Sequence, residues 1–156
     1  MDFSRETPGP AGGALAMGVA AAIERLFGLL RWLSPPGGLS LTGAATLATL
    51  ERSGPYRLTA LAAREGVTQP AMTQLIARLQ DGGLITRAAD PADGRAVEVR
   101  ITPGGSALLA RRRAYRAERL AGLLARLSPQ EQASLAAALP ALDALTSAHV
   151  ADRSTT

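Results

Sequence analysis

The segment Leu58 to Thr102 reads LTALAAREGVTQPAMTQLIARLQDGGLITRAADPADGRAVEVRIT. Its pattern predicts two helices that are separated by a tight turn and followed by a β-hairpin. A helix-turn-helix with such a hairpin, or wing, inserts one helix into the DNA major groove and a loop into the neighbouring minor groove. The segment therefore predicts a mainly α fold with a small β-hairpin wing, and it indicates a role in DNA binding.

The two helices and the turn between them are predicted from residues that favour helix ends and turns. The first helix is expected over Leu58 to Glu65, with Thr59 able to cap its start. Gly66 suits the tight turn that follows. The second helix, expected over Thr68 to Gln80, begins with a good N-cap residue, and Pro70 falls in its first turn, where the missing N–H costs little.

The second helix has an unusual outward face. On a wheel of about 100° per residue, its large apolar residues form one stripe, and small and polar residues with a single charge lie opposite. Glutamine can bond adenine edges, threonine can touch a thymine methyl, and Arg78 suits a phosphate or, in a tilted helix, a guanine. The alternative is a short surface helix that only packs. The residues expected to contact DNA are Thr68, Gln69, Pro70, Thr73, Gln74, Ala77 and Arg78.

The wing is expected as strands over 84–88 and 96–101, joined by a turn-rich tip. An arginine at the tip, Arg95, can enter a narrow minor groove, and Asp93 could aim its guanidinium through a charge-assisted hydrogen bond. The alternative is that Asp93-Gly94 is only a hairpin turn and Arg95 is solvated. The wing residues expected to contact DNA are Arg87, Asp93, Gly94 and Arg95.

Long helices are expected on both sides of this segment. We divide the chain into a disordered tail (1–11), an N-terminal dimerisation helix (12–34), a winged helix-turn-helix DNA-binding domain (38–102) and C-terminal dimerisation helices (103–150). The N-terminal helix (12–34) carries a coiled-coil a/d seam, in which apolar residues recur at spacings of 4, 3, 4 and 3. The seam residues are Val19, Ile23, Leu26, Leu30 and Leu33.

The C-terminal part should form two helices. One is expected from Pro103 to about Leu127, and a capping box, Ser128 to Glu131, opens the other. The last helix should reach about His149, and Pro140 should kink or break it. One stripe of it carries Leu135, Leu139, Leu142 and Leu145.

A basic run lies in the first of these two helices. It has five arginines and one acid, Glu118, for a net charge of +4. The arginines could contact phosphates, pair across a dimer, or simply coat a solvated face. They are Arg111, Arg112, Arg113, Arg116 and Arg119.

Composition excludes several kinds of function. The chain has no Cys and a single His, so we expect no disulfide, metal site or cofactor, and no arrangement of residues points to an enzyme. The net charge of +4 is compatible with a polyanionic partner. The 13-residue apolar run from Ala11 to Ile23 is too short to span a bilayer, and the N-terminus lacks the basic region of a signal peptide. We therefore expect a cytoplasmic protein with no membrane partner.

Several motifs in the right order and spacing resemble the MarR family of bacterial transcription regulators. They are LTALAAREGVTQPAMTQLIARLQDGGLITR, DPADGRAVEVRIT, TPGGSALL and LARLSPQEQ, and the resemblance covers about residues 39 to 145. It implies an obligate homodimer whose interface is made by the first and the last two long helices. By motif, Thr68 to Gln80 would be the recognition helix, and Asp93 and Arg95 the wing residues.

The resemblance also implies how such a protein works. Members bind palindromic operators in double-stranded DNA and are released by small, often aromatic or phenolic ligands. Phe27, Arg31 and Trp32 are the candidate lining of an effector pocket, with ordinary core and surface of a long helix as the alternative. We therefore expect a homodimeric regulator, first of all a repressor. The competing interpretation is a winged helix that binds another protein and has no operator.

Overall fold

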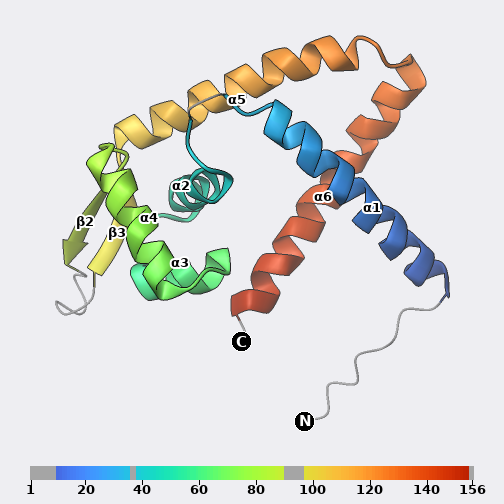
Figure 1. Ribbon diagram of the computed structural model, residues 1–156. Helices are drawn as coiled ribbons and strands as arrows, with labels where there is room; N and C mark the ends of the chain where they lie inside the picture. Colours follow the sequence, from blue (N-terminus) through green and yellow to red (C-terminus); the bar gives the residue numbers. More distant parts are fainter. Residues whose placement is uncertain (1–9, 36–37, 90–96, 155–156) are drawn as a thin grey trace. The chain divides into compact units, whose positions relative to one another are not determined.

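The computed structural model describes residues 10–35, 38–89 and 97–154. The chain divides into two units, Met1–Pro36 and Gly37–Thr156, and each is described by itself. In the first unit, α1 (Pro10–Trp32) forms a single helix, close to the 12–34 expected from the sequence (Figure 1). Most of the tail predicted over residues 1–11 lies outside the described residues.

Most of the apolar surface of α1 is exposed. Leu15, Met17, Ile23, Leu26 and Phe27 are each between 51% and 74% exposed. By length and composition alone, Ala11–Trp32 could cross a membrane, which corrects the expectation drawn from the shorter apolar run. Core helices of soluble proteins and N-terminal signal sequences meet the same criterion, so this observation is weak evidence for a membrane span.

The second unit begins with the winged helix-turn-helix. Three helices, α2 (Leu41–Ser53), α3 (Leu58–Glu65) and α4 (Gln69–Asp81), are followed by β2 (Ile85–Ala89) and β3 (Val97–Ile101). The short strand β1 (Tyr56–Arg57) completes an antiparallel sheet of order β1-β3-β2. Tyr56 pairs with Val99, and Ile85 pairs with Ile101.

The core of this unit lies between the three helices and the sheet. It is aliphatic because the chain has few aromatic residues, and the apolar stripe predicted for α4 contributes four of its members. Gly105 closes this core at the start of α5 (Pro103–Leu124), because a Cβ there would overlap the carbonyl oxygen of Leu84. The buried residues are Leu47, Leu50, Leu61, Ala62, Met72, Leu75, Ile76, Leu79, Ile85, Val99 and Leu109.

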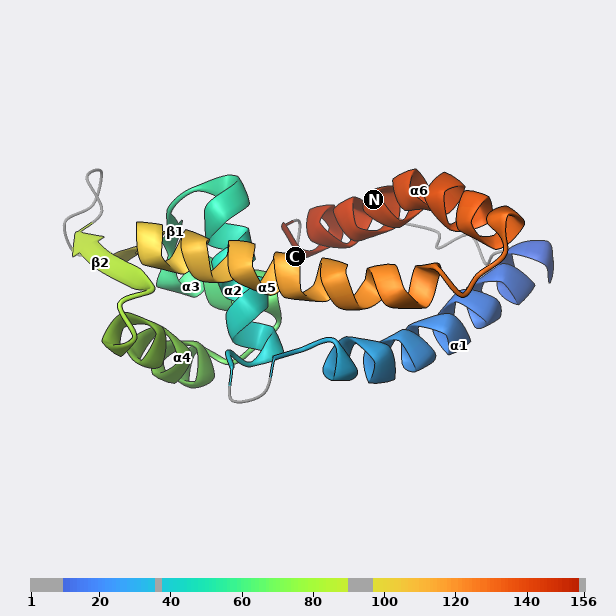
Figure 2. The same ribbon diagram turned by 90° about the horizontal axis from the view of Figure 1, so that it is seen from above.

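Both predicted C-terminal helices form, but they end at residues other than the predicted ones. α5 ends at Leu124, and α6 (Pro129–Ser154) turns back from its end (Figure 2). The capping box that begins α6 is confirmed, since Ser128 and Glu131 exchange hydrogen bonds. The helix continues through Pro140, so of the kink or break predicted there, the break is wrong. Its predicted stripe is 48–59% exposed at Leu135, Leu139, Leu142 and Leu145.

Two local predictions need correction. Thr59 does not cap α3, because the helix begins one residue earlier, at Leu58, and Arg57 occupies the N-cap without a side-chain hydrogen bond. The basic run of α5 is not a uniformly solvated face either, because Arg112 is only 4% exposed. The sequence pattern of five nearby arginines does not distinguish the buried position from its exposed neighbours.

Candidate nucleic-acid interface

The orientation of α4 is set by the turn before it. Gly66 adopts a left-handed φ of 67°, and its N–H bonds back to the end of α3. Thr68 then caps α4, its hydroxyl oxygen accepting a hydrogen bond from the Ala71 N–H at 3.4 Å. Both features follow from the sequence signals at these positions, since glycine tolerates the left-handed conformation and threonine is a favoured N-cap.

The two faces of α4 differ as the helical wheel predicts. Met72 and Ile76 are 0% exposed, so the apolar stripe holds the helix against the core. On the other side, the predicted contact residues are exposed, except Ala77, which is half-buried. The helix is therefore fixed by one side and presents the other to solvent.

The outward side chains leave hydrogen-bonding groups available. Within the part of the chain that the structure describes, the side-chain amides of Gln69 and Gln74 make no hydrogen bond. The Thr73 hydroxyl instead donates to the Gln69 carbonyl at 2.9 Å, so it can offer a partner only its lone pairs and its methyl group. A shallow groove is lined by Gln69, Pro70, Thr73 and Gln74.

A second hollow lies between the start of α2 and α4. Arg78 lies at this hollow together with Ser40 and Thr42. Ser40 is the N-cap of α2, and its hydroxyl oxygen accepts the Gly43 N–H at 3.0 Å. The positive end of a helix and a guanidinium at one hollow suit an anion such as a DNA phosphate. Our sequence analysis missed this contribution of α2, although a serine directly before an apolar helical segment is a recognisable N-cap signal.

The wing is only partly described. Arg87 is exposed on β2, where it lies opposite Val99 in the register of the hairpin. On β3, Arg100 donates to Glu98 at 2.9 Å. The predicted tip residues, Asp93, Gly94 and Arg95, lie outside the described residues.

Known proteins match both the sequence and this architecture. The sequence profile of the MarR family matches residues 39–97. An HTH-type transcriptional regulator of Mycobacterium tuberculosis is 39% identical over 131 residues, which cover 84% of this chain and 92% of that protein. The chain belongs to the MarR family. It is therefore a transcriptional regulator rather than an enzyme, and the family carries the DNA-binding function inferred from α4 and the wing.

Other relatives of this MarR-family chain are less similar. A transcriptional repressor of Mycobacterium tuberculosis is 33% identical over 97 residues, covering 62% of this chain and 70% of the repressor. Two solved structures share the fold. One, from Mycobacterium tuberculosis, has a TM-score of 0.75 and 23% identity, covering 85% and 94% of the two chains. The other is Bordetella bronchiseptica BpsR, described as regulated in DNA binding by 6-hydroxynicotinic acid, with a TM-score of 0.59 and 22% identity over 83% and 98%.

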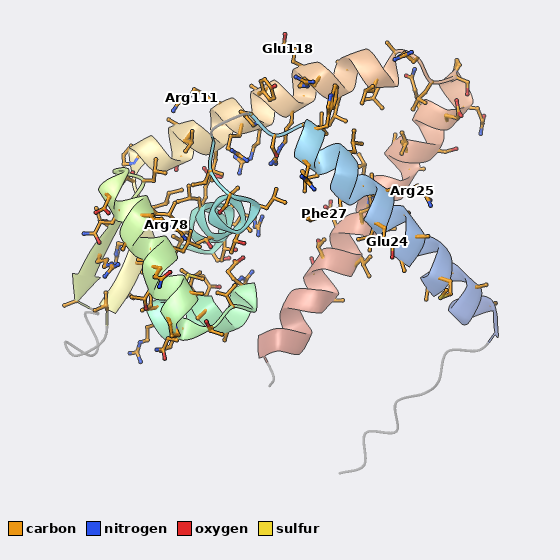
Figure 3. The ribbon with its side chains drawn as sticks, in the orientation of Figure 1. Glu24, Arg25, Phe27, Arg78, Arg111 and Glu118 are labelled. Atoms are coloured by element: carbon orange, nitrogen blue, oxygen red, sulfur yellow. The ribbon has the colours of Figure 1, made fainter. Side chains whose placement is uncertain are left out.

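The residues predicted for an effector pocket of this MarR-family regulator lie on α1. Phe27, which Figure 3 labels, lies in its last two turns together with Arg31 and Trp32, and all three residues are exposed. Phe27 and Trp32 are 54% and 50% exposed. Among the described residues, no group of three or more His, Cys, Asp or Glu is arranged to hold a metal ion.

Proposed function

We propose that this MarR-family protein binds a palindromic operator as a homodimer and represses transcription there. The observation that carries this proposal is the outward face of α4, where the amides of Gln69 and Gln74 have no partner in the described chain. The other side of α4 is buried against the core, and the two amides lie in its N-terminal half, the part from which recognition helices contact base edges.

We infer that the two hollows beside α4 contact different parts of the DNA, one the bases and the other a phosphate. The groove at Gln69 and Gln74 would face the base edges of the major groove, where glutamine can make two hydrogen bonds to adenine. The hollow at Ser40 and Arg78 would take a phosphate, which fixes the position of the helix without reading sequence. Arg87 and the tip residues Asp93, Gly94 and Arg95 would follow the adjacent minor groove.

Dimerisation through α1, α5 and α6 is supported by exposed apolar side chains. The leucines of α6 are exposed, and so are apolar residues of α1 within its own unit; exposed apolar side chains gathered on a helix often mark interaction sites. A two-fold dimer would repeat α4 at a distance of about 34 Å, so that both copies meet major grooves on one side of the DNA. The proposal keeps the domain boundaries predicted from the sequence, with DNA binding in 38–102 and dimerisation in 12–34 and 103–150.

Repression and release are supported by similar proteins. A relative with 33% identity is named a repressor, and a protein of the same fold is described as controlled by 6-hydroxynicotinic acid. We propose that a small aromatic ligand likewise shifts this dimer between DNA-competent and DNA-incompetent forms. Phe27, Arg31 and Trp32 remain its candidate contacts on α1. A regulator of this kind would act in the cytoplasm, where bacterial DNA lies.

The test is a fluorescence-anisotropy titration of the full chain on DNA from upstream of its own gene, with a scrambled duplex as control. At two salt concentrations, we expect tighter binding to the upstream DNA and a steep loss of affinity with salt. If the operator does not lie in the upstream DNA, a genome-wide binding-site selection tests whether the protein prefers any other sequence. Failure to prefer any sequence in both experiments would refute the proposal and favour the protein-binding winged helix instead.

A further inference from the structure

The shallow groove at the start of α4 is short and is built from one helix. Its lining residues are Gln69, Pro70, Thr73 and Gln74. At a rise of about 1.5 Å per residue, Gln69 and Gln74 are separated by roughly 7.5 Å along the helix axis. Successive bases of a DNA strand are about 3.4 Å apart, so this length corresponds to about two steps along the duplex. The groove therefore matches about three adjacent base pairs.

The Thr73 hydroxyl can only accept a hydrogen bond from a partner. Its proton is donated to the Gln69 carbonyl at 2.9 Å, so the oxygen presents lone pairs and the methyl group presents an apolar surface. Guanine offers only acceptors, N7 and O6, to the major groove. Thr73 therefore cannot donate to guanine, whereas its methyl group suits the methyl group of a thymine.

The two glutamine amides match adenine better than guanine. Within the described chain, neither the Gln69 nor the Gln74 side chain makes a hydrogen bond, so each amide keeps its acceptor and its donors. Adenine donates from N6 and accepts at N7, so that one amide satisfies both groups. On guanine, the amide carbonyl would face the acceptor O6 and would lose water without gaining a hydrogen bond. Each glutamine therefore favours an A·T pair.

Arginine, the usual side chain for reading guanine, does not line this groove. Arginine is not scarce, because all 17 basic residues of the chain are arginines. On α4, which the structure describes in full, the arginine is Arg78. It lines the other hollow, together with Ser40 and Thr42, where the start of α2 also favours a phosphate. The charged donor that could read guanine thus lies away from the glutamine amides.

A negative charge limits the contact to the first part of α4. Asp81, the last residue of the helix, is exposed. On a wheel of about 100° per residue it lies within about 20° of Pro70, so it is on the same outward face. Its carboxylate would repel DNA phosphates that came close to the end of the helix. Base contacts are therefore expected from Gln69 to Gln74 rather than along the whole helix.

We infer that α4 reads about three adjacent A·T pairs in each half of the operator. The amides of Gln69 and Gln74 each bind an adenine, and the Thr73 methyl group contacts the methyl group of a thymine. The inference rests on the proposed function, because it names the base pairs that the proposed DNA-binding site selects. It also assigns the sequence preference to the first two turns of α4 and leaves Arg78 to the phosphate backbone.

The first experiment selects binding sites from a random pool of double-stranded DNA with the full chain. We expect palindromic sequences that carry about three adjacent A·T pairs at the same place in each half. Selection with Gln74→Ala should lose the preference at one of these pairs. Gln80→Ala is the matched control, because it removes an exposed glutamine from the last turn of α4 and should recover the wild-type sequence.

Base analogues then show which groove of the selected DNA is read. Replacing an A·T pair by inosine·cytosine gives the major groove the groups of G·C but keeps the minor groove of A·T. Replacing adenine by 2,6-diaminopurine does the reverse, since it adds only the minor-groove amino group. Uracil in place of thymine removes only the methyl group. Binding of each duplex is measured by fluorescence anisotropy at one salt concentration.

At the selected A·T pairs, inosine·cytosine should weaken wild-type binding about tenfold or more, whereas 2,6-diaminopurine should change it less than about twofold. In Gln74→Ala, the penalty for inosine·cytosine should disappear at the pair that this glutamine reads, and Gln69→Ala should do the same at another pair. Uracil at the contacted thymine should weaken binding of the wild type. It should have no effect on Thr73→Ser, which keeps the hydroxyl but lacks the methyl group.

Four results would each overturn the inference. They are selected half-sites with G·C pairs where Gln74→Ala alters the preference, a larger penalty from 2,6-diaminopurine than from inosine·cytosine, an inosine·cytosine penalty that is unchanged in both glutamine variants, and a uracil penalty that is unchanged in Thr73→Ser. In all four, the chain still binds a specific operator, so the proposed function stands. If the selection enriches no sequence at all, the proposed function is contradicted and the inference is overturned with it.

Discussion

The Thr49 hydroxyl on α2 donates a 2.8 Å hydrogen bond to Oε1 of Glu65, the last residue of α3. Thr49 is 3% exposed, so this bond forms away from bulk water. Glu65 directly precedes Gly66, the residue at which the chain turns into α4. Through this pair, α2 fixes the end of α3 from which α4 departs.

Thr49→Val should therefore destabilise the fold by about 1–3 kcal/mol, because it keeps the shape of the side chain but leaves the half-buried carboxylate without its donor. Chemical denaturation measures the change. Thr49→Ser, which restores the hydroxyl, should recover most of the loss. Equal stability of the valine variant and the wild type would show that water replaces this bond.

Gly105→Ala should lower stability by about 1–3 kcal/mol, because the added Cβ would overlap the Leu84 carbonyl oxygen and the Ile101 side chain. Gly104→Ala is a close control, since the nearest atoms to its Cβ are 3.4 and 3.5 Å away. Thermal unfolding of the two variants checks the difference. Similar melting temperatures would mean that β2 and α5 adjust to the methyl group.

Gln74→Ala should reduce the preference for the operator over scrambled DNA by about 1–3 kcal/mol, the usual value of a bidentate base contact. Binding to scrambled DNA should change little, because that binding depends on phosphate contacts. Gln80→Ala, an exposed glutamine at the other end of α4, should retain the preference. An equal loss on both DNAs would show that Gln74 does not read bases.

Arg95→Ala should weaken operator binding by roughly 1–3 kcal/mol, since a wing arginine would lose its place in the negative potential of the minor groove. Anisotropy titrations at several salt concentrations measure both the affinity and its salt dependence. Arg126→Ala removes an exposed arginine between α5 and α6 and should leave operator binding unchanged. An unaltered affinity in the Arg95 variant would exclude this side chain from the mechanism.

Acid should weaken the start of α6 through Glu131. Hydrogen bonds from the side chain and backbone of Ser128 lower the pKa of this carboxyl group from its usual value. Because the folded pKa lies below the unfolded one, the contribution to stability is present above the ordinary glutamate pKa of 4.5 and is lost as pH falls through the folded value.

Unfolding of the wild type and Glu131→Gln is compared from about pH 7 to about pH 3. The wild type should lose more stability on acidification than the glutamine variant, which cannot titrate at this position. Parallel curves for the two proteins would contradict a role for the Glu131 carboxylate in the cap.

Local signals were sufficient for the helix-turn-helix. Thr68 and Gly66 have strong conformational preferences, and the apolar stripe of α4 follows helical periodicity. The turn, the N-cap and the buried face of α4 could therefore be predicted from neighbouring residues alone. The prediction that Thr59 caps α3 was wrong, because α3 begins at Leu58 and Thr59 lies inside the helix. Threonine suits an N-cap in general, so the residue type alone could not show this. The hollow at Ser40 and Arg78 joins residues on different helices, which no local pattern relates.

Arg112 shows a different limit of sequence reasoning. In a run that contains Arg111 and Arg113, every arginine has the same intrinsic preference for water, so the charge pattern indicates a solvated face. Arg112 is buried on the side of α5 that also buries Gly105 and Leu109, and α5 contacts α2. Only tertiary structure distinguishes the buried arginine from its neighbours.

The pairing of Tyr56 with Val99 bears on how the protein folds during synthesis. These two residues close a loop that contains all of α3, α4 and β2. Closing so long a loop costs entropy that is recovered only when the non-local contacts form. A chain emerging from the ribosome can thus form the α4 helix early, but it cannot complete the sheet that supports the wing until Val99 has been made.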